Sequence, residues 1–156
     1  MPLNAFRNTF AGNPLDRASE RRKDETWLAE QLASPEALAF VLWNGKLLVE
    51  NSKEGGVQIA YLPSRMADEL AGGRERLLFM GLWKDTPVFA VDMEGPADPC
   101  DGPLQGLGRF DELRGLAMRL PATETAIAGT AKGMFEWRRK HKRCSVCGEP
   151  SETAEG

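Results

Sequence analysis

The spacing of apolar residues changes along the chain, and the changes predict the order of its elements. The chain is polar and rich in turn formers up to about Lys23. Beyond it, Trp27, Leu28 and Leu32 recur at helical spacing in "DETWLAEQLA". The side chain of Asp24 can accept a hydrogen bond from a free amide of the first turn. We therefore expect a short helix that begins after Asp24.

Two hairpins are predicted downstream of this helix. In "LAFVLWNGKLLVEN", two apolar runs flank Asn44 and Gly45, the dipeptide that most readily adopts the positive φ angles of a tight turn. In "RERLLFMGLWKDTPVFAVDM", strands at 77–83 and 88–91 are expected to be joined by a turn around 85–87. Between the hairpins, "VQIAYLP" predicts a strand, and "PSRMADELAGG" predicts a short helix that its two glycines end.

The second half of the chain predicts a loop and then helices. Residues 94–108 hold three prolines and four glycines and are expected to form a loop. The segment "FDELRGLAMRLPATETAIAGTAKGMFEWRRKHKR" is expected to be helical in two pieces broken at Pro121. Strands that precede helices, without regular alternation, predict an α+β fold: a mixed or antiparallel sheet built from the hairpins, with C-terminal helices.

Composition narrows the class of protein. With 156 residues, 42% of them hydrophobic, the chain can form one globular domain with its own core. A net charge of -3 gives no overall attraction to nucleic acid or to an anionic membrane, so any site for such a partner must be local. The chain has no apolar run long enough for a signal peptide or a membrane span. Three cysteines, two of them as C-x-x-C, suit a reducing compartment, so we expect a cytoplasmic protein with no membrane partner.

One local cluster of charge lies near the end of the chain. From Lys132 to Arg143 there are six Lys or Arg residues and one acid, Glu136. Cations at the end of a helix complement its partial negative charge. The same side chains could instead form a patch for the phosphates of a nucleotide or RNA. His141, the only histidine, lies inside this run and is expected to be a solvated residue at a helix end.

The candidate metal ligands are Cys144 and Cys147 in "RCSVCGEP". Gly148 follows them at once and permits the tight turn whose amides donate to metal-bound sulfurs, as in a zinc knuckle. A redox pair would normally follow a strand and begin a helix, whereas this pair follows a long helix. The remaining interpretation is that the two cysteines are free thiols without a function. A structural zinc ion takes four ligands, so this pair supplies half a site.

Other familiar chemistry is missing from the sequence. It has no G-x-x-x-x-G-K-[ST], G-x-G-x-x-G or H-E-x-x-H motif, and no Glu-Glu dipeptide. We assign no catalytic and no cofactor-binding residue on this chain.

The segment "AIAGTAKGMFEWRRKHKRCSVCGEPSETAEG" resembles the helix and first zinc knuckle that precede the catalytic domain in the NADH pyrophosphatase branch of the Nudix hydrolases. The upstream "ERRKDETWLAEQL", "VLWNGKLLV" and "LLFMGLWKDTPVFAVD" also resemble that family's N-terminal domain. The resemblance implies an α+β domain over residues 1–139 and the first half of a zinc ribbon over 140–156, with Cys144 and Cys147 as zinc ligands. It also implies that the catalytic Nudix domain is absent from this chain.

The family's chemistry gives further expectations. The parent enzyme is expected to hydrolyse NADH or NAD to a nicotinamide mononucleotide and AMP with magnesium or manganese, and NAD-capped RNA is a further substrate of some relatives. A full-length homodimer is expected. Without the acidic Nudix helix, this chain alone is expected to be an inactive fragment of that enzyme. Two alternatives are a stand-alone interaction module and a small RNA-binding protein that uses the basic C-terminal helix.

Overall fold

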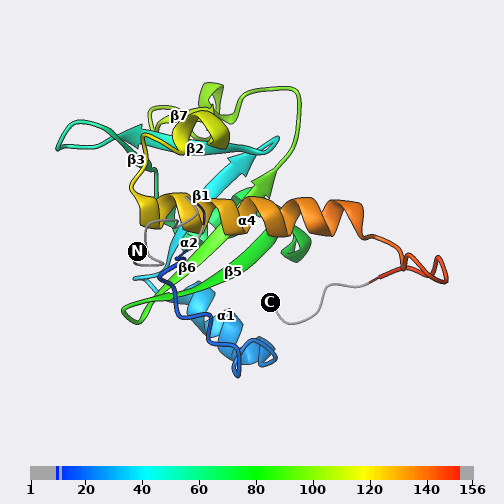
Figure 1. Ribbon diagram of the computed structural model, residues 1–156. Helices are drawn as coiled ribbons and strands as arrows, with labels where there is room; N and C mark the ends of the chain where they lie inside the picture. Colours follow the sequence, from blue (N-terminus) through cyan, green and yellow to red (C-terminus); the bar gives the residue numbers. More distant parts are fainter. Residues whose placement is uncertain (1–9, 11, 152–156) are drawn as a thin grey trace, which may run out of the picture.

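The computed structural model describes residues 10 and 12–151, and these form a seven-stranded mixed sheet with helices on both faces (Figure 1). The helices are α1 (Glu25–Ala33), α2 (Ser64–Ala71), α3 (Leu113–Leu116) and α4 (Ala122–Lys140), with the short 3-10 turns η2 (Arg74–Arg76) and η3 (Pro99–Asp101). The strands are β1 (Leu38–Trp43), β2 (Lys46–Asn51), β3 (Val57–Ile59), β4 (Leu62–Pro63), β5 (Leu77–Trp83), β6 (Thr86–Met93) and β7 (Arg109–Glu112). This is the α+β fold with a mixed sheet and C-terminal helices that the sequence predicts.

The strand order is β3-β2-β1-β6-β5. Strands β1 and β6 lie side by side and parallel, with Leu38 opposite Val88 and Trp43 opposite Met93. The other pairs are antiparallel, including those of β4 with β1 and of β7 with β2. The parallel pair is what makes the sheet mixed rather than antiparallel.

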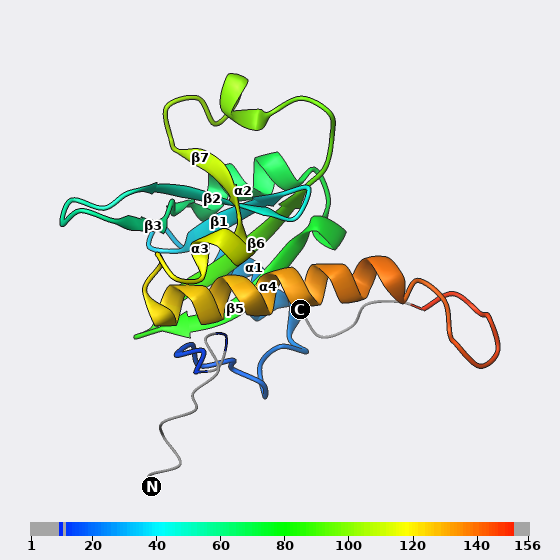
Figure 2. The ribbon, with the colours of Figure 1, turned by 45° about the horizontal axis from the view of Figure 1, so that its top comes forward.

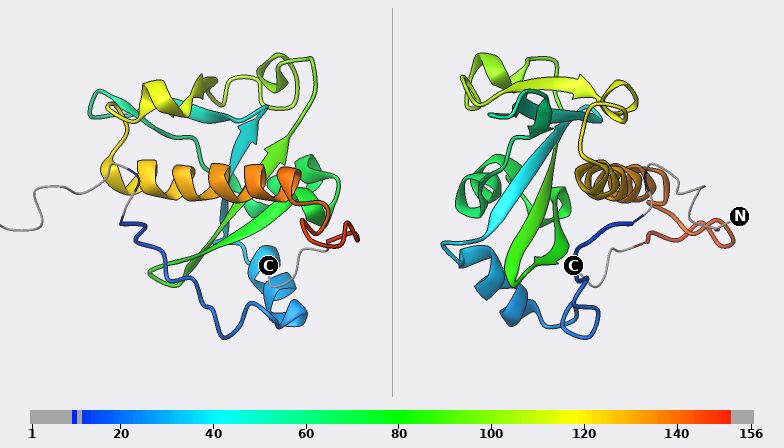
Figure 3. Two further views of the ribbon diagram at one scale, coloured as in Figure 1. Left: turned by 45° about the vertical axis from the view of Figure 1, so that its right-hand side comes forward. Right: turned by 60° about the vertical axis from the view of Figure 1, so that its left-hand side comes forward.

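Each face of the sheet has its own apolar core. On one face, side chains of β1, β2, β5 and β6 pack against α3 and α4, including the fully buried Phe135. On the other face, residues such as Val41 and Phe89 pack against α2 and α1. Figure 3 shows the sheet edge-on between α4 and the α1–α2 pair. Burial on both faces explains why the central strands are continuous apolar runs.

Two local predictions are confirmed. The Asp24 carboxylate accepts a hydrogen bond from the amide of Trp27 at 3.0 Å and caps α1. Asn44 and Gly45 have φ angles of 49° and 79° and connect β1 to β2. Both features depend only on neighbouring residues, so sequence alone could indicate them.

Two strand predictions need correction. The second hairpin turns at Lys84 and Asp85, with φ angles of 47° and 71°, while Pro87 lies inside β6 opposite Leu82. Two consecutive positive φ angles match the twist of the strands, so the turn is tighter than predicted. The predicted strand "VQIAYLP" is divided into β3 and β4, because its first part pairs with β2 and its end pairs with β1.

The predicted helix that begins at Phe110 is wrong in its first residues. Arg109–Glu112 form β7 and pair with Lys46–Val49 of β2. These hydrogen bonds complete the free edge of β2 and outweigh the local preference for helix. Only Leu113–Leu116 and the long α4 are helical, and Pro121 does separate them.

The predicted domain border at residue 139 falls one residue before the end of α4. The border remains a prediction. Residues 1–9 and 11 of the predicted domain, and residues 152–156 of the predicted half ribbon, lie outside the described residues. Within the described part of the chain, no helix combines the length and the apolar character needed to cross a lipid bilayer.

Candidate metal centre

The C-x-x-C segment lies directly beyond the C-terminal end of α4. Helix α4 is 19 residues long and spans the face of the sheet, as Figure 2 shows. His141 ends the helix: its amide donates to the carbonyl of Trp137 at 2.9 Å, and its ring stacks on the Trp137 indole with centroids 4.9 Å apart. The prediction that His141 is a solvated residue at a helix end is confirmed.

The two cysteines lie on a closed turn, here called the knuckle and comprising residues 143–150. The amide of Gly148 donates to the carbonyl of Cys144 at 3.0 Å, and the amide of Cys144 donates to the carbonyl of Glu149 at 2.8 Å. Gly148 has a φ angle of 76°, which favours glycine. Arg143 and Pro150 form an isolated antiparallel bridge. The backbone therefore forms a closed turn around the C-x-x-C pair through hydrogen bonds between residues of the turn itself.

The electrostatics of the knuckle favour a thiolate. Hydrogen bonding from the backbone amide of Cys147, then from that of Val146 and from the Cys147 side chain, lowers the pKa of the Cys144 thiol below its usual value. The Val146 amide lies 3.4 Å from Cys144 Sγ. Since the thiolate is the form that binds metal, these hydrogen bonds make Cys144 suitable as a candidate ligand. The donor set and the turn fit one half of a tetrahedral zinc site.

The other half of a site is not assembled by the described residues. No group of three or more His, Cys, Asp or Glu side chains comes together among them in a way that could hold a metal ion. His141 Nδ1 lies 2.9 Å from the carbonyl oxygen of Trp137. Cys100 lies in η3, where burial raises the pKa of its thiol. The structure thus brings Cys144 and Cys147 together and leaves Cys100 and His141 outside their turn.

Several basic residues of the run 132–143 are engaged within the protein. Lys132 Nζ donates to the carbonyl of Gly45 at 2.7 Å. Arg138 Nη1 donates to the carbonyl of Leu77 at 3.1 Å, and Arg143 Nη1 donates to the carbonyl of Gly148 at 3.1 Å. These contacts support a structural role for much of the run, rather than a free patch that faces phosphates.

Sequence reasoning missed a cluster of charges around Arg139. Arg139 contacts the carboxylates of Asp92, Glu94 and Glu136 at 2.8, 3.0 and 3.1 Å. The signal that could have found it is Asp92 itself, a carboxylate inside the apolar strand "VFAVDM" on the same alternating face as Val88 and Ala90. Burying an unpaired carboxylate is costly, so a buried Asp is expected to have a cationic partner, and the basic run 132–143 contains one in Arg139.

Comparisons with known proteins identify the family of this chain. Residues 36–137 match the family model described as the NADH pyrophosphatase-like rudimentary NUDIX domain. The chain is also 33% identical over 124 residues to the NAD-capped RNA hydrolase NudC of Deinococcus radiodurans. That alignment covers 80% of this chain and 38% of the relative, so the chain spans well under half of the relative's length.

Proposed function

The chain belongs to the family of NADH pyrophosphatase-like rudimentary NUDIX domains, and from this premise we propose that it is the non-catalytic N-terminal part of a Nudix NAD(H) diphosphatase. In this proposal residues 1–139 form the NUDIX-like domain and residues 140–156 form the first half of a zinc ribbon. The observation that carries the proposal is the order along the chain: the family match ends at residue 137, and the closed turn with the C-x-x-C pair follows within ten residues.

The proposed role of the knuckle is structural. Cys144 and Cys147 would hold a zinc ion as thiolates, with Cys144 favoured by the amides of Cys147 and Val146. A bound zinc ion would be coordinated by ligands from both halves of the ribbon and would thereby link them. The cytoplasmic location expected from free thiols belongs to the same proposal.

The proposed substrate class for the parent enzyme is NADH or NAD, cleaved at the diphosphate to nicotinamide mononucleotide and AMP with magnesium or manganese. The Deinococcus radiodurans relative is an NAD-capped RNA hydrolase, which supports NAD-capped RNA as a further substrate. We do not assign the hydrolysis to this chain, which has no Glu-Glu dipeptide. Asp111 and Glu112, which the sequence predicts to lie on a helix, belong to β7.

Zinc binding tests the structural half of the proposal. We would titrate the purified chain with zinc against a chromophoric chelator, beside Cys144→Ser and the matched control Cys100→Ser. Two ligands should give weak binding that Cys144→Ser abolishes and Cys100→Ser leaves unchanged. Binding that survives Cys144→Ser would contradict the assignment of the knuckle.

Hydrolysis tests the other half. The chain and the Deinococcus radiodurans relative would each be mixed with NADH and with NAD-capped RNA in the presence of magnesium or manganese, and the cleavage products measured. We expect no products from this chain. Turnover at a rate near that of the relative would show that the chain carries an active site of its own.

The alternatives raised by the sequence gain no support from these contacts. An RNA-binding role would need the basic run to be free, whereas Lys132, Arg138 and Arg139 each bind groups of the protein itself. A stand-alone interaction module stays a prediction without an observation that favours it.

A further inference from the structure

We propose that Arg139 is a positioning residue, whose contacts fix the direction in which α4 presents the knuckle to the rest of the zinc ribbon. The proposal rests on the function proposed above, because the direction of the knuckle matters only if further chain completes the site. Arg139 and the carboxylates of Asp92, Glu94 and Glu136 are called the Arg139 clamp below.

The Arg139 clamp joins three parts of the fold. Arg139 Nη1 lies 2.8 Å from Asp92 Oδ2 in β6 and 3.0 Å from Glu94 Oε1 just after β6. Arg139 Nη2 lies 3.1 Å from Glu136 Oε1, one turn earlier in α4. A planar guanidinium held through both terminal nitrogens has little freedom to rotate. The last turn of α4 is therefore tied to the end of β6.

Within the Arg139 clamp, the pair of Arg139 with Asp92 is more buried than the other ion pairs found in the described part of the fold. The side chains of Arg139 and Asp92 are only 28% and 10% exposed, whereas those of Arg74 and Glu25 are 78% and 86% exposed. Exposed pairs are screened by water and contribute little, while a half-buried pair is screened less. Burial raises the pKa of Asp92, and the charge of Arg139 opposes that rise. The charge of Arg139 thus favours the ionised form of this carboxylate.

A neighbouring residue gives α4 a second point of attachment. Arg138 Nη1 donates to the carbonyl of Leu77 at the start of β5, at 3.1 Å. Strands β5 and β6 are adjacent in the sheet. Consecutive residues of the helix therefore hold two adjacent strands, which opposes both lifting and rotation of the helix end.

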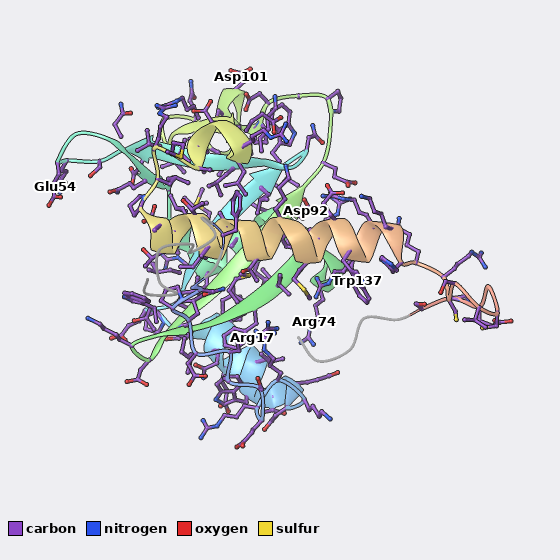
Figure 4. All side chains as sticks on the ribbon, viewed as in Figure 1. Arg17, Glu54, Arg74, Asp92, Asp101 and Trp137 are labelled. Carbon is purple, nitrogen blue, oxygen red and sulfur yellow. The ribbon has the colours of Figure 1, made fainter. Side chains whose placement is uncertain are left out.

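The knuckle itself offers no comparable attachment. Among the described residues, the backbone hydrogen bonds found for the knuckle stay between residues 142 and 151, and its side chains are exposed apart from that of Cys144. Figure 1 shows the knuckle beyond the end of α4, away from the sheet. Figure 4 shows Asp92 and Trp137 at opposite edges of α4, and Trp137 is 53% exposed. The end of α4 is thus the part of the fold that can set the direction of the knuckle.

Residual dipolar couplings of backbone amides, measured in a dilute alignment medium, test this proposal without zinc or substrate. The variant is Arg139→Met, which keeps the aliphatic stem and removes the guanidinium. The matched control is Lys140→Met, which removes a charge from the same helical turn where the side chain is 74% exposed. In the wild type and in Lys140→Met, couplings of Arg138, Lys140 and Cys144 should fit the alignment tensor of the sheet. In Arg139→Met they should lose that fit while the couplings of β1 and β6 keep it.

Other outcomes would overturn the proposal. Knuckle couplings that fit the sheet tensor in Arg139→Met would show that the clamp does not position the helix end, and a poor fit already in the wild type would show the same. If Arg139→Met fails to fold, Arg139→Lys keeps the charge without the planar fork and should show the same selective loss. If the couplings of the whole sheet also lose their fit in that variant, Arg139 stabilises the fold in general and does not position the helix end. Because no step uses zinc or NADH, failure here is distinguishable from failure of the proposed function.

Discussion

The guanidinium of Arg22 donates a hydrogen bond of 2.7 Å to the carbonyl of Phe79, which lies 57 positions later in the sequence. The same nitrogen lies 3.2 Å from the carbonyl of Met80. The register of β5 against β6 shifts between Phe79 and Gly81, and this bulge directs successive carbonyls toward one donor. Arg22 is only 8% exposed, so it joins the N-terminal arm to the edge of the sheet from a buried position.

Replacing this arginine should destabilise the fold. Arg22→Met leaves two buried carbonyls without their donor and should lower the free energy of unfolding by about 2 to 3 kcal/mol. Chemical denaturation measures the effect. The control is Arg21→Met: Arg21 is exposed and lies over the Trp27 ring at 5.6 Å, so its loss should cost under about 1 kcal/mol. Equal losses in the two variants would contradict the role of Arg22.

The approach of the N-terminal arm to β5 should depend on Gly81. Gly81 has a φ angle of 141°, and a Cβ built there would overlap the carbonyl oxygen of Asp16, which bridges to Leu82. We expect Gly81→Ala to destabilise the protein by about 1 to 3 kcal/mol. Gly133→Ala is the control, since a Cβ there meets no atom within 4 Å and alanine favours the interior of α4 by about 1 kcal/mol. Thermal melts of both variants would show opposite signs; a Gly81→Ala variant as stable as wild type refutes the prediction.

The stability of the fold should depend on the protonation of Glu124. Burial raises the pKa of Glu124 above 4.5, a hydrogen bond from the Ile59 amide at 2.7 Å opposes the rise, and the charge of Glu50 adds to it. Because the folded pKa is raised, the folded state binds more protons than the unfolded state in this window. The stabilisation is full below pH 4.5 and is lost as pH rises through the folded pKa.

Glu124→Gln isolates this effect, because glutamine keeps an oxygen that accepts from Ile59 but does not titrate there. The free energy of unfolding of the wild type, minus that of Glu124→Gln, should fall as pH rises from 4.5 and then level off. Urea unfolding at a series of pH values gives the curve. A difference that rises with pH would mean that the pKa is lowered instead.

Removing the knuckle should leave the domain intact. A chain that ends at Lys140 keeps all of α4 and both cores. We expect a single cooperative unfolding transition with a midpoint close to that of the longer chain, measured by circular dichroism in denaturant. Loss of cooperativity would show that residues 141–156 belong to the core.

Self-association of the chain should be weak. The family resemblance leads us to expect a homodimer of the parent enzyme, with part of its interface in the catalytic domain. In this chain the outer edge of β5 is bridged by Asp16 at Leu82 and by Arg22 at Phe79, which hinders pairing of that edge with a second copy. Sedimentation at micromolar concentration should give a monomer or a weak dimer. A tight dimer would contradict this prediction and would show that this domain alone forms a stable dimer interface.

Short-range interactions explain which features could be predicted from the sequence. The cap at Asp24, the turn at Asn44 and Gly45, and the closed turn around Cys144 are each completed by residues a few positions apart. Backbone preference and hydrogen bonds within such a segment favour one conformation before the rest of the chain folds. The sequence by itself therefore determined the class of fold, the long C-terminal helix and the knuckle beyond it.

Only the tertiary structure decided the features that depend on distant partners. Arg109–Glu112 became a strand because the edge of β2 needed hydrogen-bond partners. Arg139 became a clamp because β6 brings Asp92, 47 positions earlier in sequence, beneath the last turn of α4. Local preferences are worth less than one kcal/mol per residue, about the size of a single net hydrogen bond, so long-range pairing and burial outweigh them. Asp92 and Arg139 come into contact only when the chain folds, and that contact is the centre of the charge network of this domain.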